Sequence, residues 1–249
     1  MRNSVSRIYA LSKRNAKEIV RDPLSLIFTF GLPLFMEVLF YLLFHKLTDQ
    51  FQMKYLAPGI VVFSQAFLAL FTGQLIALDR STSFLTRLYV SRAKPVEFLL
   101  SYALPILPLT LLQSVLFFVV GGIFDTELFG AGMAFAILFG IFTSLFYIAM
   151  GILFGSVCSE KSIGGIASIL VACQSLLSGM WFPIEGLGQG MLNLMDALPF
   201  RNATQLVQNA ALGFGDPWVD LWRPFLILLG YTLAAFIGAV LIFRKKMKQ

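Results

Sequence analysis

The chain is poor in charged residues, which make up 13% of its 249 residues, and it has one histidine and two cysteines. A soluble domain carries about 25% charged residues, and disordered chains are charge-rich and apolar-poor. Two cysteines cannot form a disulfide framework, and the single histidine, His45, excludes a metal site built on two histidines. What the chain does have is a 58% hydrophobic content that includes 26 phenylalanines. A soluble protein of this size cannot bury so many apolar side chains, so the composition predicts a membrane protein.

Catalytic motifs are also missing. The sequence contains no G-x-S-x-G, and the segment nearest to a phosphate-binding loop runs from Gly155 to Ser162. Glu160 stands where that loop needs its second glycine, and its carboxylate would repel a phosphate. No strand is predicted before the segment, so a short turn is the better interpretation. We therefore expect a chain that is not an enzyme by itself and binds no cofactor or metal.

Six apolar stretches are each long enough to cross a bilayer as a helix, which takes about 20 residues. Strands of a membrane barrel would be about ten residues long and would alternate in polarity, and these stretches do neither. The sequence therefore predicts an all-α membrane protein with a single transmembrane domain over residues 1–249. The predicted spans are residues 24–44, 56–78, 96–120, 131–157, 163–182 and 224–243.

Basic residues are distributed unequally between the two sides that six spans would define. The termini and the second and fourth connections carry 6 + 4 + 1 + 4 = 15 of the 19 basic residues, and the other side carries Lys46, Lys54, Arg201 and Arg223. Cytoplasmic loops are the ones enriched in lysine and arginine. Both termini are therefore predicted to be cytoplasmic, and the net charge of +6 is mainly an orientation signal, with no nucleic-acid partner expected.

Two segments outside the spans have helical patterns. In residues 1–22, apolar side chains recur at helical spacing with basic residues on the rest of the surface, which is typical of a helix lying in the membrane interface. A basic flank that merely orients the first span is the alternative. Residues 183–223 contain two apolar-patterned stretches, 191–198 and 202–212, that are too short to span. We expect them to form short helices on the outer side.

A few polar residues lie within the predicted spans. Glu37 is the only acid well inside one, and a charge there costs at least ~2.5 kcal/mol on insertion scales. A functional role and a structural pairing are equally compatible with it. Gln65, Gln74 and Gln113 could line a path or link helices by hydrogen bonds. Prolines in the first and third spans, Pro33, Pro105 and Pro108, are expected to kink them.

The connection 79–95 between the second and third spans is the most informative loop. Ser81 or Thr82 can cap a short helix, in which Phe84, Leu85 and Leu88 would form an apolar stripe beside basic residues. An exposed amphipathic helix of this kind fits a partner protein's groove. The alternative is that its stripe rests on the membrane surface.

In this loop the chain resembles the permease subunits of type-2 ABC exporters, especially the drug-resistance branch typified by the daunorubicin exporters. Those proteins have an acid-Arg-x-x-Gly-Phe-Leu-x-Arg-Leu segment after the second span. The matching residues are Asp79, Arg80, Phe84, Leu85, Arg87 and Leu88. Ser83 replaces the usual glycine, and the proline of a following Val-Ser-Pro is missing, since Arg92 follows Val90 and Ser91.

Two further segments carry the resemblance. Residues 178–183 read Ser-Gly-Met-Trp-Phe-Pro, similar to the family's Ser-Gly-x-x-Phe-Pro at the end of the fifth span, and Leu198-Pro199 precedes a short helix ending at Gly213.

The resemblance implies a mechanism. Two permeases, identical or related, would pair above two copies of an ATP-binding subunit that holds the ATP and Mg²⁺. Residues 79–92, through the six matching positions named above, would form the coupling helix, and the segment before Asp22 would also touch the ATPase. The outer helices, starting at Phe182 and Pro183, would form the external gate.

The leading hypothesis is therefore ATP-driven export of a hydrophobic or amphiphilic compound, such as a drug, an antibiotic or a lipid-like molecule, across a bacterial plasma membrane. On this hypothesis the chain would take part in multidrug export and antibiotic resistance. Export of a lipid-linked glycan, a proton-coupled secondary transporter that uses Glu37, and a non-transporting scaffold or sensor are the alternatives.

Overall fold

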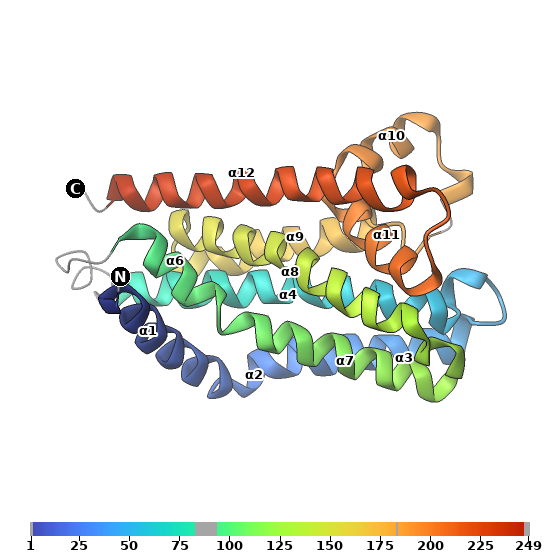
Figure 1. The fold of residues 1–249 in the computed structure, drawn as a ribbon, viewed down its shortest axis with the longest axis horizontal. Helices are drawn as coiled ribbons and strands as arrows, with labels where there is room; N and C mark the ends of the chain where they lie inside the picture. Colours follow the sequence, from blue (N-terminus) through green and yellow to red (C-terminus); the bar gives the residue numbers. More distant parts are fainter. Residues whose placement is uncertain (1, 83–93, 183, 247–249) are drawn as a thin grey trace.

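The computed structural model describes residues 2–82, 94–182 and 184–246, and every regular element in these ranges is helical. The α-helices, in chain order, are α1 (Arg2–Val20), α2 (Pro23–Leu26), α3 (Leu32–Phe44), α4 (Met53–Ser81), α6 (Pro95–Ala103), α7 (Ile106–Phe124), α8 (Ala131–Val157), α9 (Glu160–Leu177), α10 (Gln189–Ala197), α11 (Pro199–Leu212) and α12 (Arg223–Lys246). The long helices run side by side as a bundle (Figure 1). The prediction of an all-helical protein is confirmed for the described residues.

Five helical segments of the described chain are long and apolar enough to cross a membrane. They are Pro23–Phe44, Met53–Ser81, Pro95–Phe124, Ala131–Val157 and Trp218–Lys245. The first joins α2 and α3 through a π-helical turn at Ile27–Gly31, and the last begins with another π-helical turn at Trp218–Trp222. These segments coincide with five of the six predicted spans.

The predicted span 163–182 differs from the structure at its end. Helix α9 has 18 residues and stops at Leu177. The prediction that the helix continues through residues 178–182 is therefore wrong. Gly179 has φ +74°, a left-handed conformation that glycine adopts without steric cost. Glu160 and Lys161 in its first turn lower the apolarity of α9, and it is not among the five candidate spans.

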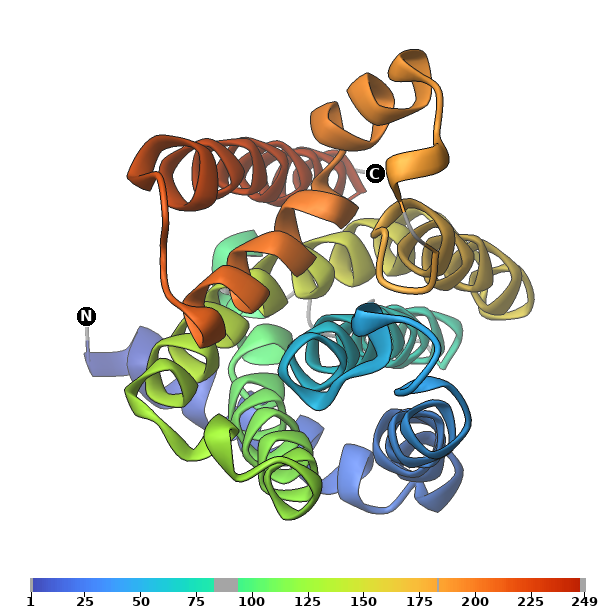
Figure 2. The same cartoon turned by 90° about the vertical axis from the view of Figure 1, so that its right-hand side faces the viewer.

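Helix α4 forms the centre of the bundle. In its apolar stretch 78% of the residues are buried, against 17% in both Pro23–Phe44 and Trp218–Lys245. It contacts α3, α7, α8, α9 and α11, and Figure 2 shows the bundle end-on. The helices at the periphery of the bundle leave large apolar side chains exposed, such as Leu42 of α3 and Leu241 of α12. A bilayer would cover these side chains.

The prolines interrupt the spans in two ways. In the third span Leu104 and Pro105 separate α6 from α7. In the first, Pro33 has no N–H to offer the carbonyl of Thr29, one α-helical turn back. Thr29 lies in the π-helical turn, and Gln113 Nε2 of α7 donates to its carbonyl oxygen at 2.8 Å. The side chain of Gln113 thus supplies a hydrogen bond that the proline removes.

Two short helices form between the last two predicted spans: α10 contains residues 191–197 of the first predicted stretch, and α11 contains the whole of the second. They lie at the end of the bundle away from the termini (Figure 1). Helix α11 buries its apolar face, which includes Leu206 and Val207, against α4 and α8. Asp196 at the end of α10 binds Arg201 at 2.5 Å and Arg223 at 3.2 Å, so one acid pairs with two of the four basic residues of this side.

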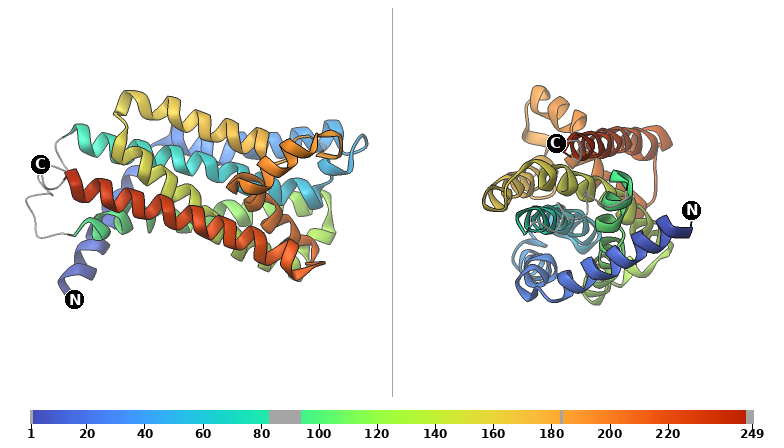
Figure 3. Two further views of the ribbon diagram at one scale, coloured as in Figure 1. Left: turned by 90° about the horizontal axis from the view of Figure 1, so that it is seen from above. Right: turned by 90° about the vertical axis from the view of Figure 1, so that its left-hand side faces the viewer.

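Helix α1 lies at the opposite end, where both termini are found (Figure 1), and it crosses the bundle obliquely (Figure 3). It packs along α6. The end of α4, the start of α6, the end of α8 and the start of α9 lie at this end as well.

Candidate functional site

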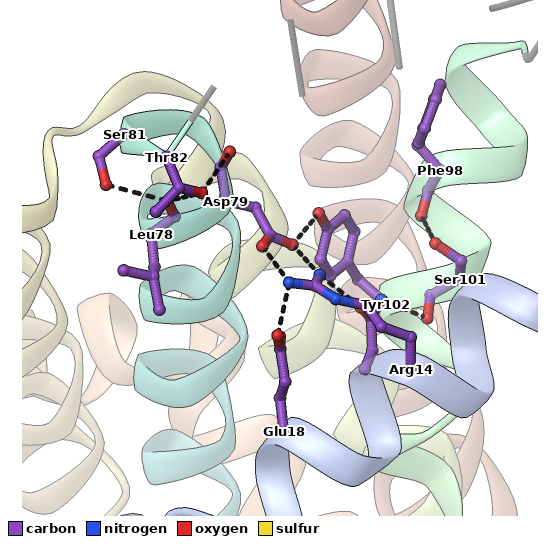
Figure 4. Close-up of polar contacts among 10 residues, drawn as sticks. Arg14, Glu18, Leu78, Asp79, Ser81, Thr82, Phe98, Ser101 and Tyr102 are labelled. Carbon is purple, nitrogen blue, oxygen red and sulfur yellow. Dashed lines mark hydrogen bonds and ion pairs between the residues drawn. The ribbon is translucent and has the colours of Figure 1, made fainter. Parts of the chain in front are cut away.

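Asp79 occupies the last turn of α4, and its side chain is only 1% exposed. Arg14 of α1 binds it with both guanidinium nitrogens: Nη2 donates to Oδ1 at 2.6 Å and Nη1 donates to Oδ2. The hydroxyl of Tyr102 on α6 donates to Oδ2 at 2.6 Å. One buried carboxylate therefore joins three helices at the root of the 79–95 loop (Figure 4).

Two further contacts fix α1 against α6. Asn15, which is buried, donates from Nδ2 to the carbonyl oxygen of Ser101 at 3.0 Å. Seven residues before Arg14, Arg7 binds Glu97 through Nε at 3.1 Å and through Nη2 at 3.2 Å. Such two-pronged pairs of arginine and carboxylate are geometrically specific, so the polar side of α1 holds the helix in one register.

The charges of this cluster influence one another. Burial lowers the pKa of Arg14, but the hydrogen bond and negative charge of Asp79, aided by Glu18, outweigh it and raise the pKa above its ordinary value. Burial raises the pKa of Glu18, and Arg14 opposes that effect. Arg14 Nη2 donates to Glu18 Oε1 at 2.5 Å. Arg14 therefore stays a cation shared by two carboxylates.

The next two residues link the loop root to two more helices. Arg80 Nη1 donates to the carbonyl oxygens of Gly155, at 3.2 Å, and Ser156, at 2.6 Å, in the last turn of α8. A cation is favourable there because the last carbonyls of a helix lack partners and carry partial negative charge. Ser81 Oγ donates to Glu160 Oε2 at 2.8 Å in the first turn of α9.

The segment 155–162, which resembles a phosphate loop only in part, forms a helix junction. Ser159 caps α9, and Ser162 Oγ in turn accepts from the Ser159 N–H at 3.0 Å. This reciprocal arrangement is a capping box.

The predicted coupling residues divide into two groups. Asp79 and Arg80 lie in the cluster, whereas Phe84, Leu85, Arg87 and Leu88 lie outside the described residues, as does Pro183. Sequence reasoning missed Arg14 and Tyr102. It named Ser81 only as a possible helix cap, whereas Ser81 is the last residue of α4 and binds Glu160. The polar face of α1 was a signal for Arg14, but nothing in the sequence paired it with an acid 65 residues later.

The glutamines predicted for a path occupy different positions. Gln65 is buried between α4 and α8, where Nε2 donates to the Gly140 carbonyl at 2.8 Å and Oε1 accepts from Thr143 at 2.9 Å. Gln113 binds Thr29, as described above. Gln74 is partly exposed and lines a cavity of about 520 Å³ near the loop root. Only Gln74 of the three therefore faces a described cavity.

Glu37 of α3 is completely buried, and neither carboxylate oxygen has a hydrogen-bond partner among the described residues. It faces α7, because a Cβ built on Gly121 would lie 3.2 Å from Glu37 Oε1 and 3.0 Å from the Cβ of Ala57. Gly121 lies within one turn of the end of α7, and Ala57 lies near the start of α4. The acid is therefore in the half of the bundle away from the termini, and it lies against Gly121.

A second polar network joins α8, α9 and α11, and sequence reasoning missed it. The Tyr147 hydroxyl on α8 donates to Gln174 Oε1 on α9, and Gln174 Nε2 donates to Thr204 Oγ1 on α11 at 3.1 Å. All three residues are buried. The predicted gate residue Phe182 is exposed, and its carbonyl oxygen accepts from Gln50 Nε2 at 2.8 Å.

The comparison with known families identifies the chain. Residues 6–212 match the family model described as ABC-2 type transporter. The chain therefore belongs to the ABC-2 type transporter family. It is a multi-pass transmembrane component of such a transporter and not its ATPase, and members of this family generally work with an ATP-binding subunit. Among curated proteins, none matches the chain.

Proposed function

We propose that the chain is the membrane-spanning permease of an exporter powered by separate ATP-binding subunits, and that it moves a hydrophobic or amphiphilic compound out of the cell. Two copies of the ATP-binding subunit and a second permease would complete the transporter. The substrate class is supported by the abundance of phenylalanine and by the scarcity of charged side chains within the spans.

The proposed topology has six spans with both termini in the cytoplasm. Helix α9 would be the fifth span: at 1.5 Å per residue its 18 residues extend about 27 Å, close to the hydrocarbon thickness of about 30 Å. The basic residues support the orientation, since 15 of 19 belong to the termini and to the connections at the same end. On this basis α1 lies in the cytoplasmic interface.

One observation carries the proposed mechanism: the root of the 79–95 loop is bound to every helix that meets it. Asp79 joins α4 to α1 and α6, Arg80 joins it to α8, and Ser81 joins it to α9. A displacement of this loop by an ATPase would therefore be transmitted to five helices at once. Nucleotide binding would bias a two-state arrangement of the bundle, and α10 and α11 would respond as the outer gate.

Binding of the ATPase is tested by changing the loop without disturbing its root. Arg87→Glu combined with Leu88→Asp should abolish co-purification of the ATP-binding subunit while leaving membrane insertion intact. The matched control is Lys46→Glu with Leu47→Asp, which also changes a basic residue followed by leucine, at the opposite end of the bundle, where Leu47 is 72% exposed. Co-purification that survives the loop variant would disprove the coupling role.

Transport is tested with the co-purified complex in sealed vesicles. Uptake of a fluorescent amphiphile into inside-out vesicles should require ATP and persist in the presence of a proton ionophore. Uptake that ignores ATP and stops with the ionophore would instead support a proton-coupled carrier. ATP-dependent movement of a lipid-linked glycan, without movement of simple amphiphiles, would support the glycan alternative.

A further inference from the structure

Two stripes of side chains run along the part of α1 that is not packed against other helices. The apolar stripe recurs at helical spacing and consists of Val5, Tyr9, Ala16 and Val20. The basic stripe beside it has one residue every four positions and consists of Lys13, Lys17 and Arg21. All of these side chains except that of Ala16 are exposed, and neither stripe contains an acid. An apolar stripe beside a basic one is typical of a helix at the surface of an anionic membrane.

A groove of about 490 Å³ separates the apolar stripe from the junction of α6 and α7. Val5 and Tyr9, each 68% exposed, line it on α1, and Leu104 and Pro105 line it on the other side. Leu104 and Pro105 belong to the candidate span Pro95–Phe124, so acyl chains are expected to cover the surface that they expose. The groove therefore opens where lipid would be the neighbour and a protein in the cytoplasm would not.

The two sides of the groove are held together by polar contacts elsewhere on α1. Pro105 has no N–H to offer the carbonyl of Ser101, four residues back. Asn15 Nδ2 donates to that carbonyl oxygen instead, at 3.0 Å, and Arg7 binds Glu97 of the same helix. Helix α1 is thus fixed at the break in the third span, and the groove is a constant feature of this break.

The charge beside the groove is positive. Lys13 is its only charged lining residue in the described part of the chain. A second cavity of about 330 Å³ shares Lys13 with the groove and is also lined by Lys17 and Arg21. Arg14 and Glu18, which line this cavity too, bind each other. Three cations therefore remain beside it without an ion pair in the described ranges, which favours an anion.

We propose that the groove and the adjoining cavity bind an anionic glycerophospholipid, whose acyl chain lies along Val5, Tyr9 and Leu104 while its phosphate binds Lys13 and Lys17. This lipid goes beyond the proposed function, because it is a bound component of the membrane and not the transported compound. It requires only the proposed position of α1 in the membrane interface. A phosphatidylcholine chain fits the same groove, but its positively charged head group would face the basic stripe.

Binding is measured by native mass spectrometry on the purified full chain in dodecyl maltoside, with lipid added in steps. Dioleoyl phosphatidylglycerol and dioleoyl phosphatidylcholine have the same acyl chains, so only the head group differs. Phosphatidylglycerol should bind about tenfold tighter, which is the scale expected for one or two basic residues at a lipid surface. Glycerol 3-phosphate, which lacks the acyl chains, should not displace it.

The head-group contact is tested with Lys13→Gln combined with Lys17→Gln. This variant should remove the preference for phosphatidylglycerol and leave the affinity for phosphatidylcholine unchanged. The matched control is Lys161→Gln with Lys245→Gln, which removes two exposed lysines at the same end of the bundle. The control should keep the preference, because it changes the net charge equally and leaves the site intact.

The acyl-chain contact is tested with Tyr9→Ser, which removes an apolar wall of the groove and should weaken both lipids. Tyr231→Ser on α12 is the control, since Tyr231 is also an exposed tyrosine within a candidate span, and it should change neither affinity. Each variant is checked by gel filtration and by its midpoint of thermal unfolding without added lipid. The substituted side chains are exposed, so these midpoints should stay close to that of the wild type.

Equal affinity for the two lipids, or a preference that survives the loss of Lys13 and Lys17, would overturn the proposal. An equal loss in the Lys161 and Lys245 control would assign the preference to net charge, and unchanged binding in Tyr9→Ser would remove the acyl chain from the groove. Displacement by glycerol 3-phosphate would make the basic stripe a site for a soluble anion. If the Lys13 and Lys17 variant kept its lipid preference but lost the ATP-binding subunit, the stripe would be a protein contact instead.

Discussion

Asp79 and Glu37 are both buried acids, but they lie in opposite halves of the bundle and in different surroundings. Asp79 has Arg14 and Tyr102 as partners and connects three helices. Glu37 has no hydrogen-bond or ion-pair partner among the described residues and lies against Gly121 of α7. A buried charge is tolerated where it is paired and hydrogen-bonded. The difference is that Asp79 is buried as part of a paired charge cluster, whereas Glu37 is buried with no ion pair or hydrogen bond to its carboxylate in the described part of the chain.

The largest expected effect follows from removing the paired charge. Asp79→Asn should lower the free energy of unfolding in mixed micelles by about 3 kcal/mol, the lower end of the range for breaking a buried pair, because Arg14 keeps Glu18 and is 32% exposed. Tyr102→Phe removes one hydrogen bond and should lower the free energy of unfolding by about 1 kcal/mol. Equal stability of Asp79→Asn and the wild type would show that the cluster does not hold the helices together.

The neutral network of the outer end should be the next most sensitive. Gln174→Leu leaves the buried hydroxyls of Tyr147 and Thr204 without their amide partner, which should destabilise the protein by about 1–3 kcal/mol. Gln189→Leu, on the exposed face of α10, is the control and should have little effect on the same unfolding measurement. In a double-mutant cycle, the variant with both Tyr147→Phe and Gln174→Leu should show a smaller decrease in the free energy of unfolding than the sum of the decreases of the two single variants.

The ion pair of Arg7 and Glu97 should contribute less to stability than the ion pair of Arg14 and Asp79. Arg7 is 38% exposed, and partly exposed pairs contribute at most about 1 kcal/mol. Arg7→Gln should therefore lower the midpoint of thermal unfolding only slightly, and less so at high salt, where exposed charges are screened. If Arg7→Gln lowered the stability as much as Asp79→Asn does, the contacts of the first half of α1 would be the ones that mainly hold this helix in place.

The smallest effect is expected at Glu37. Glu37→Leu replaces an unpartnered polar group by an apolar one of similar size, which should leave stability unchanged or raise it slightly. ATP-dependent uptake of an amphiphile should be retained. If the variant is folded and its uptake is lost, Glu37 takes part in transport, and the contrast with Asp79 would be one of function and not only of stability.

Much of the architecture is readable in the sequence. Five of the predicted spans coincide with candidate spanning helices, and the two short helices predicted between the last two spans are present. The end of the fifth predicted span could not be located from hydropathy, because the apolar content persists from Leu177 to Phe182 although the backbone turns at Gly179. Hydropathy measures transfer out of water and does not detect a change in backbone direction.

The site was only partly predictable. Asp79 and Arg80 were found through a local pattern, and their surroundings were not, since Arg14, Tyr102 and Glu160 come from other segments. Gln65 and Gln113 illustrate the opposite case. Their sequence positions fit a polar path, but each binds a backbone carbonyl of a neighbouring helix.

The sequence by itself determined the class of the protein, the places of the apolar helices, the excess of basic charge at one end and the breaks at proline, because each of these depends on composition and local stereochemistry. The tertiary structure alone decided which buried polar groups are paired. The carboxylate of Asp79 binds Arg14, whereas the carboxylate of Glu37 has no hydrogen-bond partner among the described residues. Which side chains are paired depends on helix packing, because packing brings together residues that are far apart in the chain.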